Sequence, residues 1–157
     1  MKQDRFLTSI LIGIAALVVV ALVVFFMRKD NLVYVTDDNP AGVVQNYVVA
    51  LHKHDHEKAY GYLADLQNKP TLEQFQQSFL NHTPDPSNSA LELGKVEISG
   101  KSASVQLNIN NSPKDPFSSG YINSDFAQLV NQNGAWKLKQ MPYNFWAYDW
   151  YTPTPKP

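Results

Sequence analysis

The chain contains no cysteine among its 157 residues. That absence excludes disulfide support of the fold, a lipid anchor attached to cysteine, and a cysteine nucleophile. The sequence also lacks a Gly-x-Ser-x-Gly pattern and a glycine-rich phosphate loop, so it gives no support to serine hydrolysis or nucleotide binding. We therefore expect no enzymatic activity and no cofactor.

Basic residues are scarce beyond the N-terminal region. From residue 30 onward, 9 lysines and arginines stand against 13 aspartates and glutamates, a net charge of −4, and the basic residues form no cluster. Proteins that bind nucleic acid concentrate positive charge on one surface. The sequence therefore predicts no nucleic-acid partner.

A long apolar run lies near the N-terminus. Residues 6–27 read FLTSILIGIAALVVVALVVFFM and contain no charge. At about 1.5 Å per residue, a helix of this length spans a hydrocarbon core of roughly 30 Å. The run exceeds the roughly 7 to 15 apolar residues of a cleavable signal peptide and ends without small residues. We predict a short tail over residues 1–5 and a transmembrane signal anchor over residues 6–27, with the lipid bilayer as a partner.

The orientation of this anchor rests on the flanking sequence. Lys2 and Arg5 precede it, and Arg28 and Lys29 follow it, so the distribution of basic residues favours neither orientation. A short N-terminal tail before a long C-terminal domain is typical of anchors that export the domain. We predict a single-pass protein of the cell membrane with an extracytoplasmic C-terminal domain.

Three helices are predicted after a linker over residues 28–38. Asn39 suits the N-cap and Pro40 the first position of the first helix. A second helical pattern runs from about residue 55 to residue 66, with Asp55 as its N-cap. A capping box at Thr71 and Gln74 begins the third helix. The apolar residues expected on the buried faces of the first and third helices are Val43, Val44, Tyr47, Val48, Leu51, Leu72, Phe75 and Phe79.

Beyond residue 89 the apolar period changes from 3.6 to 2, which indicates strands. Alternating residues on both sides of the sequence Ser99-Gly100-Lys101-Ser102 predict a β-hairpin. A strand from about residue 121 to residue 130 then leads into Asn133-Gly134, a strong hairpin signal. Pairing across this second turn sets Leu129 opposite Leu138, and Asn131 opposite Trp136.

Helices followed by antiparallel strands predict an α+β domain. The segments NPAGVVQNYVVALHKHDHEKAYGYL and FAQLVNQNGAWKLKQM resemble the opening helices and the last hairpin of small, membrane-anchored extracytoplasmic members of the nuclear transport factor 2-like (cystatin-like cone) superfamily. The resemblance implies a cone-shaped domain over residues 39–142, in which three helices pack on a curved antiparallel sheet. It also implies that two copies can form a homodimer through their sheets.

Three histidines lie close together in the stretch HKHDHEKAY, residues 52–60. On one continuous helix His52 and His56 would face the same way, a spacing that can hold zinc. The resemblance instead places a turn at His54 and Asp55, with His54 in the left-handed conformation. We interpret this stretch as a solvated turn, with pH-dependent surface charge and a metal site as the alternatives.

Enzymes that share the cone fold use an acid or base and tyrosines that face a cavity. The residues of this chain that could line such a cavity are Tyr47, Tyr60 and Asp125. No catalytic motif of the superfamily matches residue by residue. We therefore interpret the tyrosines as core residues with their hydroxyls at the rim, and the aspartate as solvated.

The last segment, residues 143–157, is aromatic and then rich in proline. Its aromatic residues are Tyr143, Phe145, Trp146, Tyr148, Trp150 and Tyr151. Aromatic side chains bury roughly 150 to 250 Å² each, which favours a segment that folds back over its own domain. A binding surface for a ligand or partner, and a position at the membrane interface, are the two alternatives.

Taken together, these features predict a membrane-anchored, non-catalytic binding or assembly domain at the membrane surface. Its contact would be the curved sheet or the aromatic segment, and another membrane protein is a possible partner. The alternative is an isomerase-like or cyclase-like enzyme that uses the cone cavity.

Overall fold

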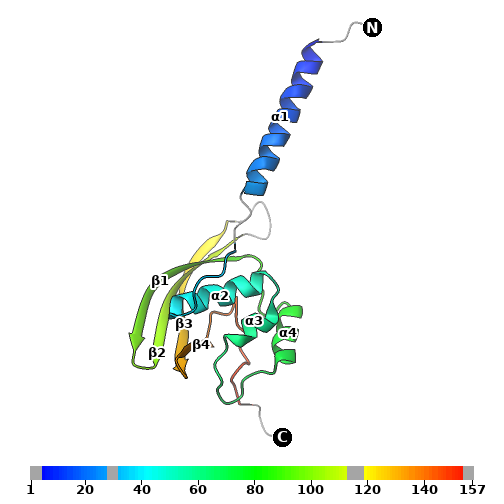
Figure 1. Ribbon diagram of the computed structural model, residues 1–157. Helices are drawn as coiled ribbons and strands as arrows, with labels where there is room; N and C mark the ends of the chain where they lie inside the picture. The colour runs from blue at the N-terminus through cyan, green and yellow to red at the C-terminus, as the bar shows by residue number, and fades with distance from the viewer. Residues whose placement is uncertain (1–4, 28–31, 113–118, 154–157) are drawn as a thin grey trace. The chain divides into compact units, whose positions relative to one another are not determined.

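The computed structural model describes residues 5–27, 32–112 and 119–153 (Figure 1). Contacts divide the chain into two compact units, Met1–Leu32 and Val33–Pro157. Residues 1–4, 28–31, 113–118 and 154–157 lie outside the described residues. Parts of the predicted N-terminal tail, linker and proline-rich end therefore lie there too, together with Lys2, Arg28 and Lys29.

The first unit consists of helix α1, Arg5–Met27. Among the described residues, no helix meets the length and apolarity needed to cross a membrane. The predicted transmembrane helix over residues 6–27 is corrected accordingly. The extracytoplasmic location stays a prediction.

Helix α2, Pro40–His52, begins where the sequence predicts. The Asn39 side chain accepts a hydrogen bond of 2.9 Å from the Gly42 amide, as an N-cap should. All five predicted core residues of α2 are buried, but the buried surface extends around most of the helix, including Asn46. Asn46 is satisfied because its side-chain amide bonds both the N–H and the carbonyl of Val35 at 2.8 Å. This pair holds the incoming chain against α2.

The joint after α2 is the predicted turn. His54 has a φ of 57°, and Asp55 caps helix α3, His56–Gly61, by accepting from the Lys58 amide at 3.1 Å. The prediction that this helix continues to Leu66 is wrong. Its chain leaves the helix because the Leu138 amide donates to the Tyr62 carbonyl and the Ala64 amide donates to the Leu138 carbonyl, both at 2.8 Å.

Helix α4, Leu72–Leu80, begins with the predicted capping box between Thr71 and Gln74. Phe75 and Phe79 are buried, whereas Leu72 is half-buried. Both phenylalanine rings contact Trp150 of the C-terminal segment, at centroid distances of 4.8 and 5.9 Å. Helix α4 thus packs on that segment, and the expectation that all three helices pack directly on the sheet is corrected. Helix α2 lies against β1, β2 and β4, and α3 reaches β4 through the hydrogen bond from Lys137 to the Gly61 carbonyl.

One antiparallel sheet has the strand order β1-β2-β3-β4. Its strands are β1 Ser89–Ser99, β2 Ser102–Asn111, β3 Tyr121–Gln132 and β4 Ala135–Gln140. The second hairpin has the predicted register, with Leu129 opposite Leu138 and Asn131 opposite Trp136. Asn133 and Gly134 both have positive φ, 55° and 88°, as a tight hairpin turn requires. The α+β class predicted from the sequence is confirmed.

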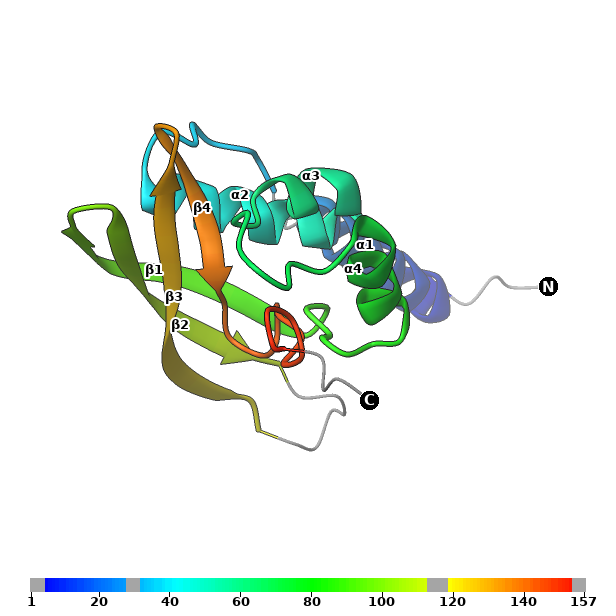
Figure 2. The ribbon, with the colours of Figure 1, turned by 90° about the horizontal axis from the view of Figure 1, so that it is seen from below.

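Strand β4 is much shorter than β3, and this difference leaves part of β3 without a partner on one side. The β4 partners of β3 run from Gln128 to Gln132 only, so residues 121–127 of β3 pair on one side, with β2. The register shifts between Gln128 and Leu129, which leaves Lys139 as an extra residue of β4, a β-bulge. After Gln140 the chain leaves the sheet and continues on the side that the helices occupy, where Figure 2 shows it in red.

Candidate binding groove

The C-terminal segment, defined here as residues 142–151, is part of the core. Phe145 is fully buried, and Trp146 and Trp150 are 6% and 7% exposed. Local hydrogen bonds fold the segment into turns, from the Phe145 amide to the Pro142 carbonyl and from the Trp150 amide to the Ala147 carbonyl. The predicted domain boundary at residue 142 therefore lies within a continuous packed region.

Helix α2 holds the middle of this segment. The hydroxyl of Tyr47 donates to the Phe145 carbonyl at 2.7 Å, and both partners are buried. The Tyr47 ring also lies 6.3 Å from the Trp146 ring. Burial, and to a lesser extent the neighbouring Tyr151, raise the pKa of Tyr47 well above its usual value, so this hydroxyl stays a donor.

A cluster of buried amides holds the start of the segment. The side-chain amide of Asn144 donates to the Ser89 hydroxyl at 2.7 Å and to the Asn111 side-chain oxygen at 2.8 Å. Asn111 in turn donates to the side chain of Asn123 at 2.7 Å. The cluster joins the segment to β1, β2 and β3 at once. The Oδ1 atom of Asn144 is buried and has no hydrogen-bond partner within the described part of the chain.

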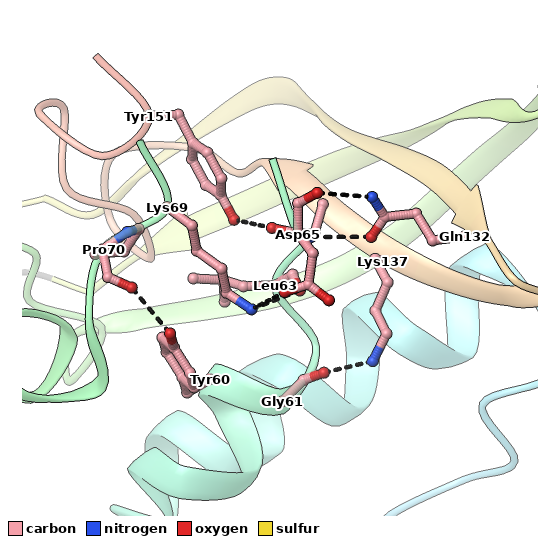
Figure 3. A network of polar contacts seen from close by, with 10 residues as sticks. Tyr60, Gly61, Leu63, Asp65, Lys69, Pro70, Gln132, Lys137 and Tyr151 are labelled. Atoms are coloured by element: carbon pink, nitrogen blue, oxygen red, sulfur yellow. Dashed lines mark hydrogen bonds and ion pairs between the residues drawn. The ribbon is translucent and has the colours of Figure 1, made fainter. Parts of the chain in front are cut away.

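The end of the segment meets the loop between α3 and α4. The hydroxyl of Tyr151 donates to the Ala64 carbonyl at 2.7 Å (Figure 3). The Tyr151 amide donates to the Asn68 carbonyl at 3.2 Å. Burial, followed by the charge of Asp65, raises the pKa of Tyr151 above its usual range. The hydroxyl thus remains protonated and continues to donate.

The same loop is braced by charged and polar side chains. Lys69 donates to Asp65 at 2.7 Å, and this hydrogen bond and charge lower the pKa of the Asp65 carboxyl. The side chain of Gln132 on β3 accepts from the Asp65 amide at 2.9 Å and donates to its carbonyl at 3.1 Å (Figure 3). These contacts fix the loop against the sheet.

Between the sheet, this loop and the C-terminal segment lies an open groove of about 780 Å³. We call it the C-terminal groove, and it is lined by residues 66–67, 125–126, 139–143, 146, 148 and 150–151. Three of the lining rings are largely exposed: Phe126 is 54%, Tyr143 64% and Tyr148 84% exposed. The groove thus combines an aromatic surface with a volume typical of ligand sites, roughly 300 to 1,000 Å³.

The groove also contains one acid and one base. Asp125 of β3 is half-buried, and its Oδ1 atom accepts from the Phe126 amide at 2.7 Å. Lys139 lies on the bulge of β4, and bulges change the direction of a side chain relative to a regular strand. Both charges therefore occur beside the place where β4 leaves β3.

The three residues predicted to line a cavity are not brought together. Tyr47 lies in the core against Phe145, and the Tyr60 hydroxyl donates to the Pro70 carbonyl at 2.9 Å. Only Asp125 of the three lines the C-terminal groove. The space under the helices where we expected the tyrosines to converge contains core side chains, among them Leu107 and Ile109.

The six aromatic residues predicted as a binding surface divide into two groups. Phe145, Trp146 and Trp150 face the core, while Tyr143 and Tyr148 are exposed and Tyr151 is partly buried. Tyr143 also approaches Tyr121, with 3.5 Å between the two hydroxyl oxygens. The buried group positions the exposed group, so the segment has both a structural part and an accessible part.

The histidines occupy the turn between α2 and α3. His52 ends α2 and His56 begins α3, so the two do not share one helix face. The ring of His56 packs instead on Phe79, with 5.5 Å between centroids, and stacks with His54 at 6.3 Å. Among the described residues, no group of three or more potential ligands is arranged to hold a metal ion.

Sequence reasoning missed Phe126, Lys139 and Asn144 as residues of this region. Phe126 and Lys139 line the groove only because β4 ends early and bulges, and nothing in the local sequence marks the bulge. Pro142 was the available signal, because proline has no N–H to continue the ladder with β3. The buried position of Asn144 depends on contacts far along the chain.

The chain matches no protein-family model and no curated protein. Among solved structures it resembles RPA3114, a SEC-C motif-containing protein from Rhodopseudomonas palustris, with a TM-score of 0.51 and 9% identity over 68% of this chain and 79% of that one. This similarity shows a shared fold and carries no information about activity.

Two further solved structures bear names of the predicted fold type. One is an uncharacterised cystatin-fold protein from Novosphingobium aromaticivorans, with a TM-score of 0.43 and 9% identity over 62% of this chain and 95% of that one. The other is a nuclear transport factor 2-like protein of unknown function from Pseudomonas putida, with a TM-score of 0.45 and 14% identity over 65% and 80%. Both TM-scores lie below 0.5, so these two structures carry no argument about this chain.

Proposed function

We propose that the unit Val33–Pro157 is a non-catalytic binding domain and that the C-terminal groove is its binding site. The observation that carries this proposal is the exposure of three aromatic rings, Phe126, Tyr143 and Tyr148, around one groove of about 780 Å³. Exposed aromatic side chains that gather in one concave place are typical of binding sites, because their burial by a partner is strongly favourable. The rigid packing behind them supports the same function.

The state of the candidate catalytic residues supports binding rather than acid–base chemistry. The hydroxyls of Tyr47 and Tyr60 each donate to a backbone carbonyl of the same chain. A catalytic acid or base must be within hydrogen-bond reach of the reacting group. The two hydroxyls would first have to break these bonds, and they do not accompany Asp125 in the groove.

The test uses indole as a probe of the aromatic surface. We expect titration of the ¹⁵N-labelled full chain with indole to shift amide signals of residues 66–67, 125–126, 139–141 and 143. Tyr148→Ala removes the most exposed ring and should weaken these shifts severalfold without a change in the rest of the spectrum, because Tyr148 is 84% exposed. Leu80→Ala is the matched control, since Leu80 is 69% exposed and lies on α4, outside the lining.

Two results would contradict the proposal. One is that indole shifts signals throughout the chain or only outside the groove. The other is that Tyr148→Ala and Leu80→Ala bind indole equally well.

A further inference from the structure

The two charges of the C-terminal groove have unused bonding capacity. Lys139 has no ion pair or hydrogen bond with any residue that the structure describes, and it is exposed. The Oδ1 atom of Asp125 accepts from the Phe126 amide, while Oδ2 has no hydrogen-bond partner in the described ranges. A lysine ammonium offers three donors, and a carboxylate accepts several hydrogen bonds. Both side chains can therefore bind a ligand without giving up a contact within the fold.

Within the part of the chain that the structure describes, these opposite charges do not neutralise one another in an ion pair. Asp125 lies on the part of β3 that extends beyond β4, and Lys139 lies on the bulge just before β4 ends. The described residues form no ion pair between Asp125 and Lys139. The groove thus presents one negative and one positive group at separate places in its lining. A ligand that fits both must carry a positive and a negative group of its own.

Aromatic rings form the rest of the accessible lining. Tyr143 and Tyr148 are 64% and 84% exposed, and neither is needed to fill the core. Ring faces of tyrosine bind other rings by offset or edge contacts, and they attract cations within about 6 Å. An aromatic ligand with an ammonium group would use both properties. An aliphatic zwitterion would use only one.

We propose that the groove binds a small zwitterionic aromatic ligand, of the class of an aromatic amino acid or a short aromatic peptide with free ends. Lys139 binds the carboxylate, Asp125 binds the ammonium group through Oδ2, and Tyr143 and Tyr148 contact the ring. This assignment rests on the proposed binding function of the groove and adds the class of ligand. The presence of one positive and one negative side chain in the lining, rather than its apolar area, is the basis of this assignment.

Strand addition is the competing mode of binding. Residues 121–127 of β3 are unpaired on the side of β4, and an internal segment of a partner could extend the sheet there. The Phe126 amide on this stretch already donates to Asp125, at 2.7 Å. A strand would have to displace that bond, whereas a zwitterion leaves it in place. Strand addition needs no free ends, so blocking the ends of a peptide distinguishes the two modes.

The experiment titrates the full chain with the dipeptide Phe-Phe by calorimetry and by ¹⁵N spectra. The dipeptide is used with both ends free, with the amine acetylated, with the carboxyl amidated, and with both ends blocked. We expect each single block to weaken binding by about tenfold or more, because each removes a charge-assisted hydrogen bond. The free dipeptide should shift the amide signals of residues 125–126, 139–141 and 143.

Variants assign each end of the ligand to its residue. Lys139→Met should weaken binding of the free dipeptide. In this variant amidation of the carboxyl should have no further effect on binding, while acetylation of the amine should still weaken it. Asp125→Asn should also weaken binding of the free dipeptide. In this variant acetylation should have no further effect, while amidation should still weaken binding. Lys101→Met and Glu92→Gln are the controls, because both residues are exposed and lie outside the groove lining. The controls should bind the free dipeptide as the unchanged chain does.

The outcomes separate this inference from the function on which it rests. If the doubly blocked dipeptide binds as tightly as the free one, the charge assignment is overturned and strand addition or apolar binding takes its place, while the groove remains a binding site. If indole shifts the groove signals but no dipeptide form does, the ligand class alone is wrong. If neither probe shifts them, the proposed function fails as well.

Discussion

At the scale of single residues, His56 shows how a polar side chain can be used in packing. Its ring lies edge-on to Phe79 at 5.5 Å and to Phe75 at 6.4 Å, and its Nδ1 atom is buried without a partner among the described residues. Burial lowers the pKa of His56, and the neighbouring His54 lowers it further, although Asp55 partly opposes them. The sequence predicted the turn around this residue but gave no sign of the ring contacts, because Phe75 and Phe79 lie on another helix.

Because the pKa of His56 is lowered, we expect the thermal stability of the protein to depend on pH. Because the folded state lowers the pKa of His56, the unfolded state binds the proton more readily, and stability should fall as the pH drops below about 6.5. We expect a melting temperature a few degrees lower at pH 5 than at pH 7.5, and His56→Gln should reduce that difference. Thermal unfolding followed by circular dichroism measures it.

The control for this prediction is His82→Asn, since His82 lies at a positive φ of 54° that asparagine tolerates well. This variant should keep the full pH dependence. Asp65 and Glu97 have lowered pKa values, so their contributions are lost only at more acidic pH, as they become protonated. If His56→Gln lost as much melting temperature between pH 7.5 and pH 5 as the unchanged chain does, the environment of the ring would have no energetic effect.

At the scale of elements, the C-terminal segment behaves as an inserted part of the core. Trp150 contacts three rings, those of Phe75, Phe79 and Trp146, within 6 Å. The sequence indicated this segment through its density of aromatic residues, since so much apolar surface is costly to leave in water. Which rings point inward could not be predicted, because that depends on turns at Pro142 and Ala147 and on a contact with Tyr47 far along the chain.

Removal of the segment should therefore abolish cooperative folding of the unit Val33–Pro157. Loss of one large buried aromatic costs about 3 to 5 kcal/mol, and the whole stability of a domain is about 5 to 15 kcal/mol. Truncation of the chain after Met141 removes three such residues, Phe145, Trp146 and Trp150. We expect the truncated chain to show no cooperative thermal transition in the near-ultraviolet circular dichroism signal.

A milder variant keeps this prediction quantitative. Trp150→Ala should lower the free energy of unfolding by about 3 to 5 kcal/mol, as measured by urea titration. Tyr148→Ala, in the same segment but 84% exposed, should lower it by less than about 0.5 kcal/mol. Equal effects of the two substitutions, or a cooperative melt after truncation, would mean that the segment is not part of the folded core.

At the scale of the whole molecule, neighbouring residues predicted most of the helices and strands, whereas long-range contacts determine the C-terminal groove. Both hairpin turns and the three helix caps follow from residues next to them, and each was predicted correctly. The left-handed His54, also confirmed, was implied by the family resemblance. The early end of α3 at Gly61 was not, because it depends on the backbone bonds of residues 62 and 64 to β4. The groove follows from a difference in length between β3 and β4, which no local pattern specifies. Pairing of two copies through their sheets stays a prediction.

The hydrogen bond of Tyr47 joins two distant parts of the unit, and its contribution to stability can be measured. Its hydroxyl links α2 to a carbonyl 98 residues away, and both groups are buried. Tyr47→Phe leaves the Phe145 carbonyl without this donor, so we expect the free energy of unfolding to fall by about 1 to 3 kcal/mol in urea titration. Tyr60→Phe is the matched control, because its bond to Pro70 is only partly buried and joins residues 10 apart. A smaller loss for Tyr47→Phe than for Tyr60→Phe would contradict this order.

The bonds of residues 62 and 64 to Leu138 also bear on whether the protein aggregates. The outer strands of a sheet offer unpaired backbone groups to which strands of other molecules can add. On β4 the groups of Leu138 are already occupied by Tyr62 and Ala64. On the opposite outer strand, β1, the register shifts between Leu93 and Val96, and an exposed ion pair joins Lys95, within this shift, to Glu97. Bulges and charges are established guards against edge-to-edge pairing, so β1 and the Leu138 part of β4 are guarded, whereas residues 121–127 of β3 stay open on the side of β4.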